Sequence, residues 1–313
     1  MVNKVSIVIP IHQKEASMNI LNTIAGIEKY SLLPHNIILS GISPDDIKPA
    51  SIPIKSHTLL THLPTGEPRG EARTYGADFA IRYYNSEYVC FCDANLIFDE
   101  RSYGWDVQLV DYLKNDGNAI VSPTLTSAET GQYLLNVLLD PADSPRLDKH
   151  HTTPYPEYNS PPQGAPALCG CFQFMPAHAF KASIFGFLPG IPMEDYELCI
   201  RLWTLGYHCV VVPSSAVSHI YRSTYVGWEG IEASVKAEEY CLTKLLFAVV
   251  NFDSDTISKV YDALGGCSDL TKEKVWGIAQ SSKWQTRKAE VLRKRIRTTD
   301  EYYKTWKKAA NYE

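Results

Sequence analysis

The sequence feature that most constrains the fold is a short apolar run that ends in two polar side chains. Residues 88–92 (YVCFC) are all apolar or aromatic, which is typical of a strand buried in a parallel sheet. Asp93 and Asn95 follow at the end of the strand where open α/β sheets bind ligands. Residues two apart in an extended segment project to the same side, so both side chains could reach one cation such as Mg²⁺ or Mn²⁺. A strand followed by an Asx turn is the simpler explanation of residues 93–95 (DAN) alone.

The segments on the amino-terminal side of this strand predict an alternating order of strands and helices. Apolar runs indicate the strands, and apolar residues at helical spacing indicate the helices. The expected strands cover residues 5–9, 37–39 and 52–60, and the expected helices cover residues 15–30 and 71–84. A β-α-β-β-α-β order predicts an α/β fold with a mainly parallel sheet and helices on both faces.

The rest of the chain divides into two parts. Further strands and helices are expected at residues 105–114, 119–122, 171–175, 194–205 and 208–212, and further helices at 231–249, 256–264 and 272–308. Residues 140–167 are rich in Pro, Asp, His and Tyr and are expected to form a long loop, which in a compact domain is usually functional or disordered. We therefore expect an α/β domain over residues 1–222 and a helical extension over residues 223–313.

Composition narrows the class of protein. An apolar content of 45% and a charged content of 21% fit a soluble globular chain. The net charge of −5 gives no indication of a nucleic-acid partner. No apolar run approaches the roughly 20 residues of a membrane span, and no secretory leader precedes the first strand. The eight cysteines lack zinc-site spacing, so we expect free buried thiols and a cytoplasmic location.

Two carboxylates open the helix expected at residues 194–205. Glu194 and Asp195 complement the positive end of a helix, and this common arrangement needs no function to explain it. The alternative is that one carboxylate faces a cleft as a general base. Leucines on the opposite side of the helix, such as Leu198 and Leu202, would bury that side and hold the carboxylates rigidly. The residues alone leave both interpretations open.

Two further groups of residues could bind an anion or a metal. His219 follows a strand, and a histidine at such a position is more often a surface residue than a metal ligand. A neutral imidazole nevertheless suits Mn²⁺, so His219 could be a ligand. Arg222, three residues later, could hold phosphate oxygens. Arg69, Gly70 and Arg73 lie where the helix after the third strand begins, which favours anion binding. A helix cap with solvated arginines explains the same residues equally well.

Taken together, these segments resemble the family 2 GT-A glycosyltransferases in their order and spacing. The carboxyl half also resembles the polypeptide N-acetylgalactosaminyltransferases, which carry an Asp-x-His motif, a Gly-Gly-x-Phe segment, a Glu-Asn-x-Glu-Leu helix and a final Gly-His-Ile-Phe-Arg. The resemblance covers roughly residues 3–222 and implies a Rossmann-like GT-A fold and a hexosyl- or N-acetylhexosaminyltransferase. The segments that carry it are residues 5–10 (VSIVIP), 69–73 (RGEAR), 92–95 (CDAN), 170–172 (GCF), 194–201 (EDYELCIR) and His219.

The resemblance also assigns roles to residues. It implies a Mn²⁺ or Mg²⁺ ion held by Asp93, Asn95 and His219 beside the diphosphate of a nucleotide-sugar. Asp195 matches the catalytic base of inverting members, and Glu194 would hold hydroxyls of the acceptor or donor. The donor-binding positions that it implies are Pro10, His12, Ser40, Arg69, Gly70, Arg73, Asp93, Ala94, Gly170, Cys171 and Arg222.

Three departures from the family pattern affect these expectations. Ser40 stands where an acid usually holds the uracil, and Asn95 is a neutral ligand that would hold a metal more weakly than an acid. Glu194 followed by Asp195, rather than Glu-Asn, favours inversion over retention. We expect a metal-dependent glycosyltransferase that moves a sugar from a nucleotide-sugar, a UDP-sugar by resemblance, to a hydroxyl acceptor. The alternative is a GT-A-fold binding protein for nucleotide-sugars or glycans with little turnover.

The acceptor and the role of the carboxyl terminus stay open at this point. The acceptor could be a glycan, a lipid-linked glycan, a peptide or a small molecule, and the chain could form homo-oligomers. Residues 272–308 hold twelve basic and four acidic residues interleaved with aromatics, which suits peripheral contact with the inner face of an anionic membrane. They also suit docking on the rest of this chain, which carries a net charge of about −13. We favour docking.

Overall fold

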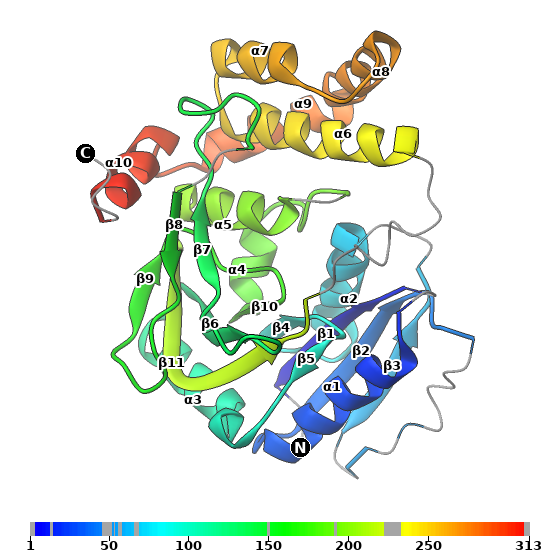
Figure 1. The fold of residues 1–313 in the computed structure, drawn as a ribbon, viewed down its shortest axis with the longest axis vertical. Coiled ribbons are helices and arrows are strands. Elements are labelled where there is room, and N and C mark those ends of the chain that lie inside the picture. Colours follow the sequence, from blue (N-terminus) through cyan, green and yellow to red (C-terminus); the bar gives the residue numbers. More distant parts are fainter. Residues whose placement is uncertain are drawn as a thin grey trace.

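The computed structural model describes residues 4–12, 15–45, 52, 54–55, 58–65, 69–148, 151–190, 193–221 and 233–309. Its centre is a mixed nine-stranded sheet (Figure 1). The strands of this sheet are β1 (Val5–Ile11), β2 (His35–Gly41), β3 (Leu59–Leu63), β4 (Tyr88–Cys92), β5 (Leu96–Ile97), β6 (Ala119–Ser127), β9 (Gln163–Ala165), β10 (Phe172–Pro176) and β11 (His208–His219). Their order is β3-β2-β1-β4-β10-β6-β11-β5, with β9 paired to β11. A separate hairpin joins β7 (Leu135–Leu138) and β8 (His151–Pro154).

Helices cover both faces of the sheet, as expected for an α/β fold. The helices of this part are α1 (Ser17–Tyr30), α2 (Arg69–Tyr83), α3 (Trp105–Asn115), α4 (Ala177–Ala182) and α5 (Glu194–Thr204). On one face, Trp105 of α3 packs edge-to-face against Phe172 of β10. On the opposite face, Phe91 of β4 packs against Phe180 of α4. Strands covered on both faces must be apolar throughout, which explains the uninterrupted run in β4.

The parallel part of the sheet follows the sequence prediction closely. β1 pairs in parallel with β2 and with β4, and β2 pairs in parallel with β3. The expected strand over residues 52–60 is wrong in position, because β3 covers Leu59–Leu63 instead. Several residues of the predicted range lie outside the described part of the chain. The expected long loop over residues 140–167 also contains β8 and β9.

Two antiparallel pairings bring distant segments to the carboxyl end of β4. β10 pairs with β4 so that Phe172 lies opposite Cys92, and the N–H of Asp93 donates a hydrogen bond of 2.9 Å to the carbonyl of Cys171. β11 runs along β6 and then pairs with β5, which places His219 opposite Leu96. Because β5 begins directly after Asn95, this pairing returns the end of β11 to the strand end that carries Asp93.

The helical extension consists of α6 (Ala233–Asn251), α7 (Ser254–Ala263), α8 (Asp269–Ala279), α9 (Ser282–Lys294) and α10 (Thr299–Ala309). Helices α6 to α9 form a layer that lies against α5, away from the parallel part of the sheet (Figure 1). Phe247, Trp284 and Tyr302 of the extension share one buried cluster with Leu188 and Trp203 of the α/β part. The extension therefore packs directly on α5 and on the loop before it. Within the described residues, no helix is long and apolar enough to cross a membrane.

Three aromatic residues of the basic tail, Trp284, Tyr302 and Tyr303, are buried inside the molecule. Trp284 and Tyr302 are 2% and 0% exposed. Lys307 forms ion pairs of 2.7 and 2.8 Å with Asp140 and Asp143 in the segment after β7. These contacts support docking of the tail on the acidic remainder of the chain, the interpretation that the sequence favoured.

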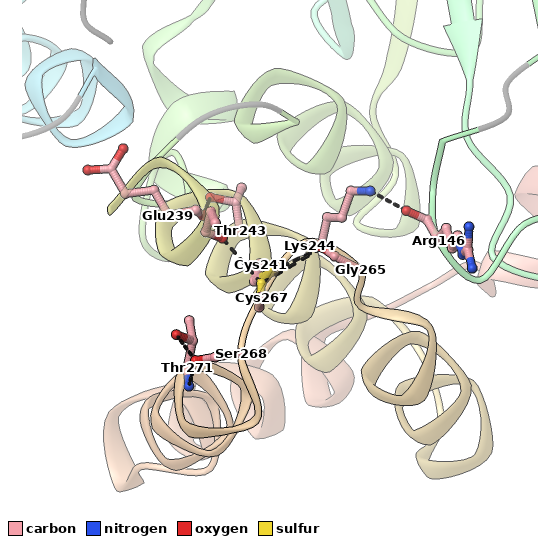
Figure 2. Close-up of a disulfide and its surroundings, with 10 residues drawn as sticks. Arg146, Glu239, Cys241, Thr243, Lys244, Gly265, Cys267, Ser268 and Thr271 are labelled. Atoms are coloured by element: carbon pink, nitrogen blue, oxygen red, sulfur yellow. Dashed lines mark hydrogen bonds between the residues drawn. A yellow bond between two sulfur atoms is a disulfide. The ribbon is translucent and has the colours of Figure 1, made fainter. Parts of the chain in front are cut away.

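One expectation about the cysteines is wrong. A disulfide joins Cys241 of α6 to Cys267, which lies just before α8 (Figure 2). The two residues are 26 positions apart, and neither has a neighbouring cysteine that would have indicated the pairing. The other six cysteines are free thiols, as expected, and five of them are buried. The disulfide lies in the helical extension and does not contact the carboxyl end of β4.

Candidate active site

Asp93 and His219 converge at the carboxyl end of β4. The Nε2 atom of His219 lies 3.7 Å from Oδ2 of Asp93, although the two residues are 126 positions apart. Asn95 joins the same region, because its side-chain amide donates a hydrogen bond of 2.7 Å to the carbonyl of Ile220, directly after His219. The sequence prediction that these three residues lie together is therefore consistent with their positions in the fold.

Arg73 connects the two groups of acidic residues. Its side chain is fully buried and forms an ion pair of 2.8 Å with Oδ1 of Asp93 and another of 3.2 Å with Oε1 of Glu194. It also donates a hydrogen bond of 2.5 Å to the carbonyl of Gly170. Buried carboxylates need such a partner, because an unpaired charge in the interior is costly. Arg73 was predicted as a donor-binding residue, and the structure adds that it links Asp93 to the start of α5.

Gly170 holds the side chain of Asp195. The N–H of Gly170 donates a hydrogen bond of 2.7 Å to Oδ2 of Asp195, and the N–H of Tyr196 donates one of 2.9 Å to Oδ1. A Cβ atom at position 170 would lie only 2.7 to 3.0 Å from the Asp195 side chain. The resemblance implied that this glycine lets a sugar approach the backbone; in the structure it makes room for the carboxylate. Asp195 is half-buried, and each of its oxygens keeps a lone pair for a proton donor.

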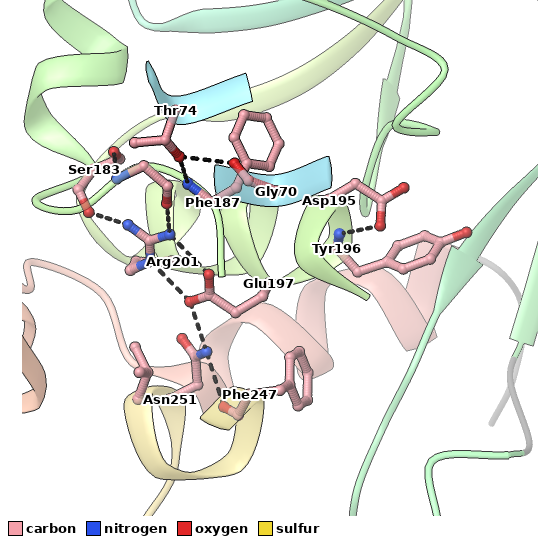
Figure 3. Close-up of polar contacts among 12 residues, drawn as sticks. Gly70, Thr74, Ser183, Phe187, Asp195, Tyr196, Glu197, Arg201, Phe247 and Asn251 are labelled. Carbon is pink, nitrogen blue, oxygen red and sulfur yellow. Dashed lines mark hydrogen bonds and ion pairs between the residues drawn. The ribbon is translucent and has the colours of Figure 1, made fainter. Parts of the chain in front are cut away.

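A buried ion pair fixes the rest of α5. Arg201 pairs bidentately with Glu197, at 2.8 Å for each of two contacts, and both side chains are fully buried (Figure 3). Arg201 also donates to the carbonyls of Ser183 and Gly186 in the segment before α5. Asn251 of α6 completes the network with a hydrogen bond of 3.1 Å to Oε1 of Glu197. Glu197 and Arg201 belong to the motif of residues 194–201, but their pairing was not predicted from the sequence, although their i, i+4 spacing is a detectable signal.

The beginning of α2 is tied to the same segment. The N–H of Phe187 donates a hydrogen bond of 3.0 Å to Oγ1 of Thr74, whose hydroxyl donates one of 2.9 Å to the carbonyl of Gly70 (Figure 3). The Cβ of any other residue at position 70 would collide with the carbonyl oxygen of Leu188. Gly70 is thus required for the close packing of α2 on this segment. This packing explains why residue 70 is a glycine, whether or not it also binds the donor as predicted.

The other predicted donor-binding residues differ in burial and in their contacts. Ser40 is fully buried and donates a hydrogen bond of 2.6 Å to the carbonyl of Ala72, so its hydroxyl serves to hold β2 against α2. Ala94 and Cys171 are buried beside Asp93. Pro10 lies within β1, and His12 follows the end of that strand; both are half-buried. The side chain of Arg69 and all of Arg222 lie outside the described residues.

Two tyrosines that were not predicted as site residues, Tyr196 and Tyr221, lie beside Asp195 and His219. The ring of Tyr221 contacts that of His219 edge-to-face, with centroids 4.5 Å apart. Tyr221 is half exposed, and the partial desolvation of its phenol raises its pKa above the usual value. Burial also raises the pKa of Tyr196 well above its usual value, and the neighbouring Asp195 carboxylate adds to the shift. Both phenols are neutral at physiological pH and can donate or accept hydrogen bonds beside the site.

The surroundings of Asp93 and His219 fit a divalent cation in part. Two atoms each about 2.1 Å from one ion can be no more than about 4.2 Å apart, and His219 Nε2 and Asp93 Oδ2 meet this condition at 3.7 Å. The other ring nitrogen of His219 is buried and has no hydrogen-bond partner in the described part of the chain. Within that part, no three His, Cys, Asp or Glu side chains form a metal site by themselves. A bound ion would therefore need Asn95 or ligand oxygens as further ligands.

Comparison with known proteins identifies the fold. No family model and no curated protein matches this sequence. The structure of GalNAc-T7 with UDP, GalNAc and Mn²⁺ superposes with a TM-score of 0.57 at 17% identity, over 89% of this chain and 57% of that chain. TarS of S. aureus with UDP-GlcNAc gives 0.54 at 10% identity, over 92% and 79% of the two chains. A mannosyltransferase from Pyrobaculum calidifontis with GDP-Man and Mn²⁺ gives 0.50 at 13% identity, over 93% and 85%.

These likenesses show that the chain has the GT-A fold of nucleotide-sugar glycosyltransferases, followed by a helical carboxyl-terminal region. The fold prediction is thereby confirmed. The chain spans little more than half the length of GalNAc-T7. At these sequence identities, the likeness shows the fold alone, because one fold can host many different activities.

Proposed function

We propose that this protein is a metal-dependent glycosyltransferase that uses a nucleotide-sugar donor. The observation that carries the proposal is the convergence of Asp93, His219, Arg73 and Asp195 at the carboxyl end of β4, where open α/β sheets bind nucleotides. Gly170 joins the two halves of this site, because its carbonyl accepts from Arg73 and its N–H donates to Asp195. The compared structures with the same fold contain UDP, UDP-GlcNAc or GDP-Man.

In this proposal, Asp195 is the general base of an inverting transfer. The acceptor hydroxyl oxygen forms a bond to the anomeric carbon of the donor sugar while the bond from that carbon to the diphosphate breaks. Asp195 takes the hydroxyl proton, and the hydrogen bonds from Gly170 and Tyr196 keep its carboxylate in a fixed orientation during the step. Arg73 holds Asp93 and Glu194 in place on either side. Glu194 is paired with Arg73, so a role in binding sugar hydroxyls would use its remaining lone pairs.

The proposed metal would be Mn²⁺ or Mg²⁺, held by Asp93, Asn95 and His219. When bound, it would neutralise charge on the leaving diphosphate. Two of the compared structures contain Mn²⁺. The ion pair between Arg73 and Asp93 leaves only Oδ2 of Asp93 near His219, so we expect the cation to bind together with the diphosphate of the donor rather than alone.

That same ion pair favours a second candidate function. Arg73 neutralises Asp93, and Ser40 is engaged with Ala72, so the site could bind a nucleotide-sugar or glycan with little turnover. A screen of UDP-, GDP- and dTDP-sugars with and without Mn²⁺ distinguishes the two functions. Metal-dependent release of the nucleoside diphosphate supports the transferase. Thermal stabilisation by a nucleotide-sugar without any release supports the binding protein. If the screen shows neither release nor stabilisation, both candidate functions are contradicted.

We also propose that the two parts of the chain have different roles. Residues 1–222 would form the catalytic domain, and residues 223–313 would hold α5 and the segment before it. The shared buried cluster and the hydrogen bond of 3.1 Å from Thr243 of α6 to the carbonyl of Pro189 support this role. Sedimentation with anionic vesicles at low and high salt tests whether the extension also contacts a membrane. Because Trp284, Tyr302 and Tyr303 are buried and Lys307 is paired with Asp140 and Asp143, we expect no binding.

A further inference from the structure

The 168–171 segment, which lies between β9 and β10 and contains Gly170, is held by hydrogen bonds along its whole length. Each of its four backbone carbonyls accepts a hydrogen bond. In chain order, the donors are the side-chain amide of Gln173 at 2.9 Å, the N–H of Phe172 at 3.2 Å, the side chain of Arg73 at 2.5 Å and the N–H of Asp93 at 2.9 Å. Turning any of these peptide groups would break a hydrogen bond, so the orientation of the Gly170 N–H depends on the contacts of its neighbours.

Tyr155 holds the backbone of this segment directly before Gly170. The N–H of Cys169 donates a hydrogen bond of 2.9 Å to the phenol oxygen of Tyr155. Tyr155 is 1% exposed, and burial raises the pKa of its phenol well above the usual value, so the phenol is neutral at physiological pH. The carbonyl of Leu168 belongs to the same peptide group as the Cys169 N–H and accepts from Gln173. Two side chains therefore fix this one peptide group from both ends.

Tyr155 is itself fixed by contacts away from the candidate site. It lies in the segment of residues 140–167, which the sequence predicted as a long functional loop, and it follows β8 directly. Its N–H donates a hydrogen bond of 2.8 Å to the carbonyl of Leu134. The carbonyl of Pro156, the next residue, accepts one of 2.6 Å from the hydroxyl of Thr124 in β6. The phenol oxygen is thus held in place by the backbone on both sides of Tyr155.

We propose that Tyr155 is a positioning residue that orients Asp195 through Cys169 and Gly170. The N–H of Gly170, which donates to Oδ2 of Asp195, comes one residue after the N–H that Tyr155 holds. Without the phenol oxygen, the Cys169 N–H loses its acceptor, the segment gains freedom to turn, and the Asp195 carboxylate loses its fixed orientation. The effect on sugar transfer rests on the proposed function, in which Asp195 is the base.

Hydrogen exchange of the full-length protein measures the positioning without any substrate. In Tyr155→Phe, we expect the amides of the 168–171 segment to exchange about five- to tenfold faster than in the wild type, the scale of one hydrogen bond. Tyr303→Phe is the matched control, because it removes the hydroxyl of another buried tyrosine that binds the backbone, at the carbonyl of Leu139. It should leave exchange of the segment unchanged. Unchanged exchange in Tyr155→Phe, or an equal increase in both variants, would overturn the proposal.

Steady-state kinetics with the donor that the nucleotide-sugar screen identifies measures the effect on transfer. Tyr155→Phe should lower kcat about five- to tenfold and leave the KM of the donor unchanged, because the contacts of Asp93 stay in place. Gln173→Met removes the other hydrogen bond to the same peptide group and should act in the same direction. If Tyr155 acts through Asp195, Tyr155→Phe should lower kcat no further in the Asp195→Asn background.

The same measurements separate a positioning role from a merely structural one. An equal loss of kcat in the wild-type and Asp195→Asn backgrounds would show that Tyr155 supports the fold rather than the base, and would overturn the proposal. A raised donor KM with unchanged kcat would do the same. Faster exchange of the 168–171 segment in Tyr155→Phe, combined with no turnover of any nucleotide-sugar by the wild type, would contradict the proposed function alone and support the positioning of the segment by Tyr155.

Discussion

The backbone N–H of Gly170 donates a hydrogen bond of 2.7 Å to Oδ2 of Asp195. This contact joins the loop before β10 to the first turn of α5, and it gives the candidate base a fixed orientation. It also explains why position 170 is a glycine, because a Cβ atom there would lie 2.9 Å from Cβ of Asp195. The geometry of the site therefore depends on a residue that contributes no side chain.

Replacement of Gly170 tests this dependence. Gly170→Ala should displace the Asp195 carboxylate and lower kcat for sugar transfer by about tenfold or more, since small displacements of a catalytic group cost rate steeply. Gly277→Ala in α8 is the control, because a Cβ there meets nothing within 4 Å. Steady-state kinetics of both variants provide the measurement. Unchanged turnover by Gly170→Ala would show that the orientation of Asp195 does not matter.

The buried pair of Glu197 and Arg201 should be important for stability. Glu197→Ala leaves the Arg201 charge buried without its carboxylate, and we expect a loss of about 3–5 kcal/mol in the free energy of unfolding. Glu290→Ala removes the carboxylate from another i, i+4 pair, with Lys294 in α9, whose side chains are about 40% exposed. That control should cost less than about 1 kcal/mol. Urea denaturation compares the two, and similar losses would contradict the stated role of burial.

The pH dependence of stability should include a contribution from Glu28. Burial alone would raise its pKa, but hydrogen bonds from His35, Thr58 and the N–H of Lys55 outweigh this effect and lower the pKa to about 2. A carboxylate with a lowered pKa in the folded state stabilises above its unfolded pKa, near 4.5, and this stability is lost as the pH falls toward 2.

Glu28→Gln isolates this contribution. The variant should be less stable than the wild type at pH 7, and the difference should shrink between about pH 4.5 and pH 2. Thermal unfolding at several pH values provides the measurement. A difference that stays constant over this range would indicate that hydrogen bonding or packing at this position, rather than ionisation of Glu28, accounts for the loss.

Local patterns were sufficient to predict most of the fold. The sequence predicted the strand over residues 88–92 and the helix that begins at Glu194 at their observed positions. Both were predictable because the pattern of apolar residues is a local property of the sequence. The predicted strand over residues 208–212 was too short. Proline and two serines interrupt the apolar run, whereas the strand continues through an irregularity between Val211 and Ala216 to His219.

Features that depend on distant partners could not be derived in the same way. Arg73 and Glu194 are 121 positions apart, and no local pattern indicates that they form an ion pair. The hydroxyl of Ser40 was expected to face the donor, yet it contacts the backbone of α2, since the packing of β2 on that helix decides where the side chain points. The convergence of Asp93 and His219 was inferred from a resemblance rather than from the residues themselves.

The role of Asp195 as base is the central claim, and Asp195→Asn tests it most directly. With the donor that the nucleotide-sugar screen identifies and Mn²⁺ present, the variant should transfer sugar with kcat lowered by about 10²-fold or more. Its affinity for the donor should be unchanged, because the contacts of Arg73 with Asp93 and of His219 with Asp93 are untouched. Near-normal transfer by Asp195→Asn would contradict the account and point to another base or to a retaining mechanism.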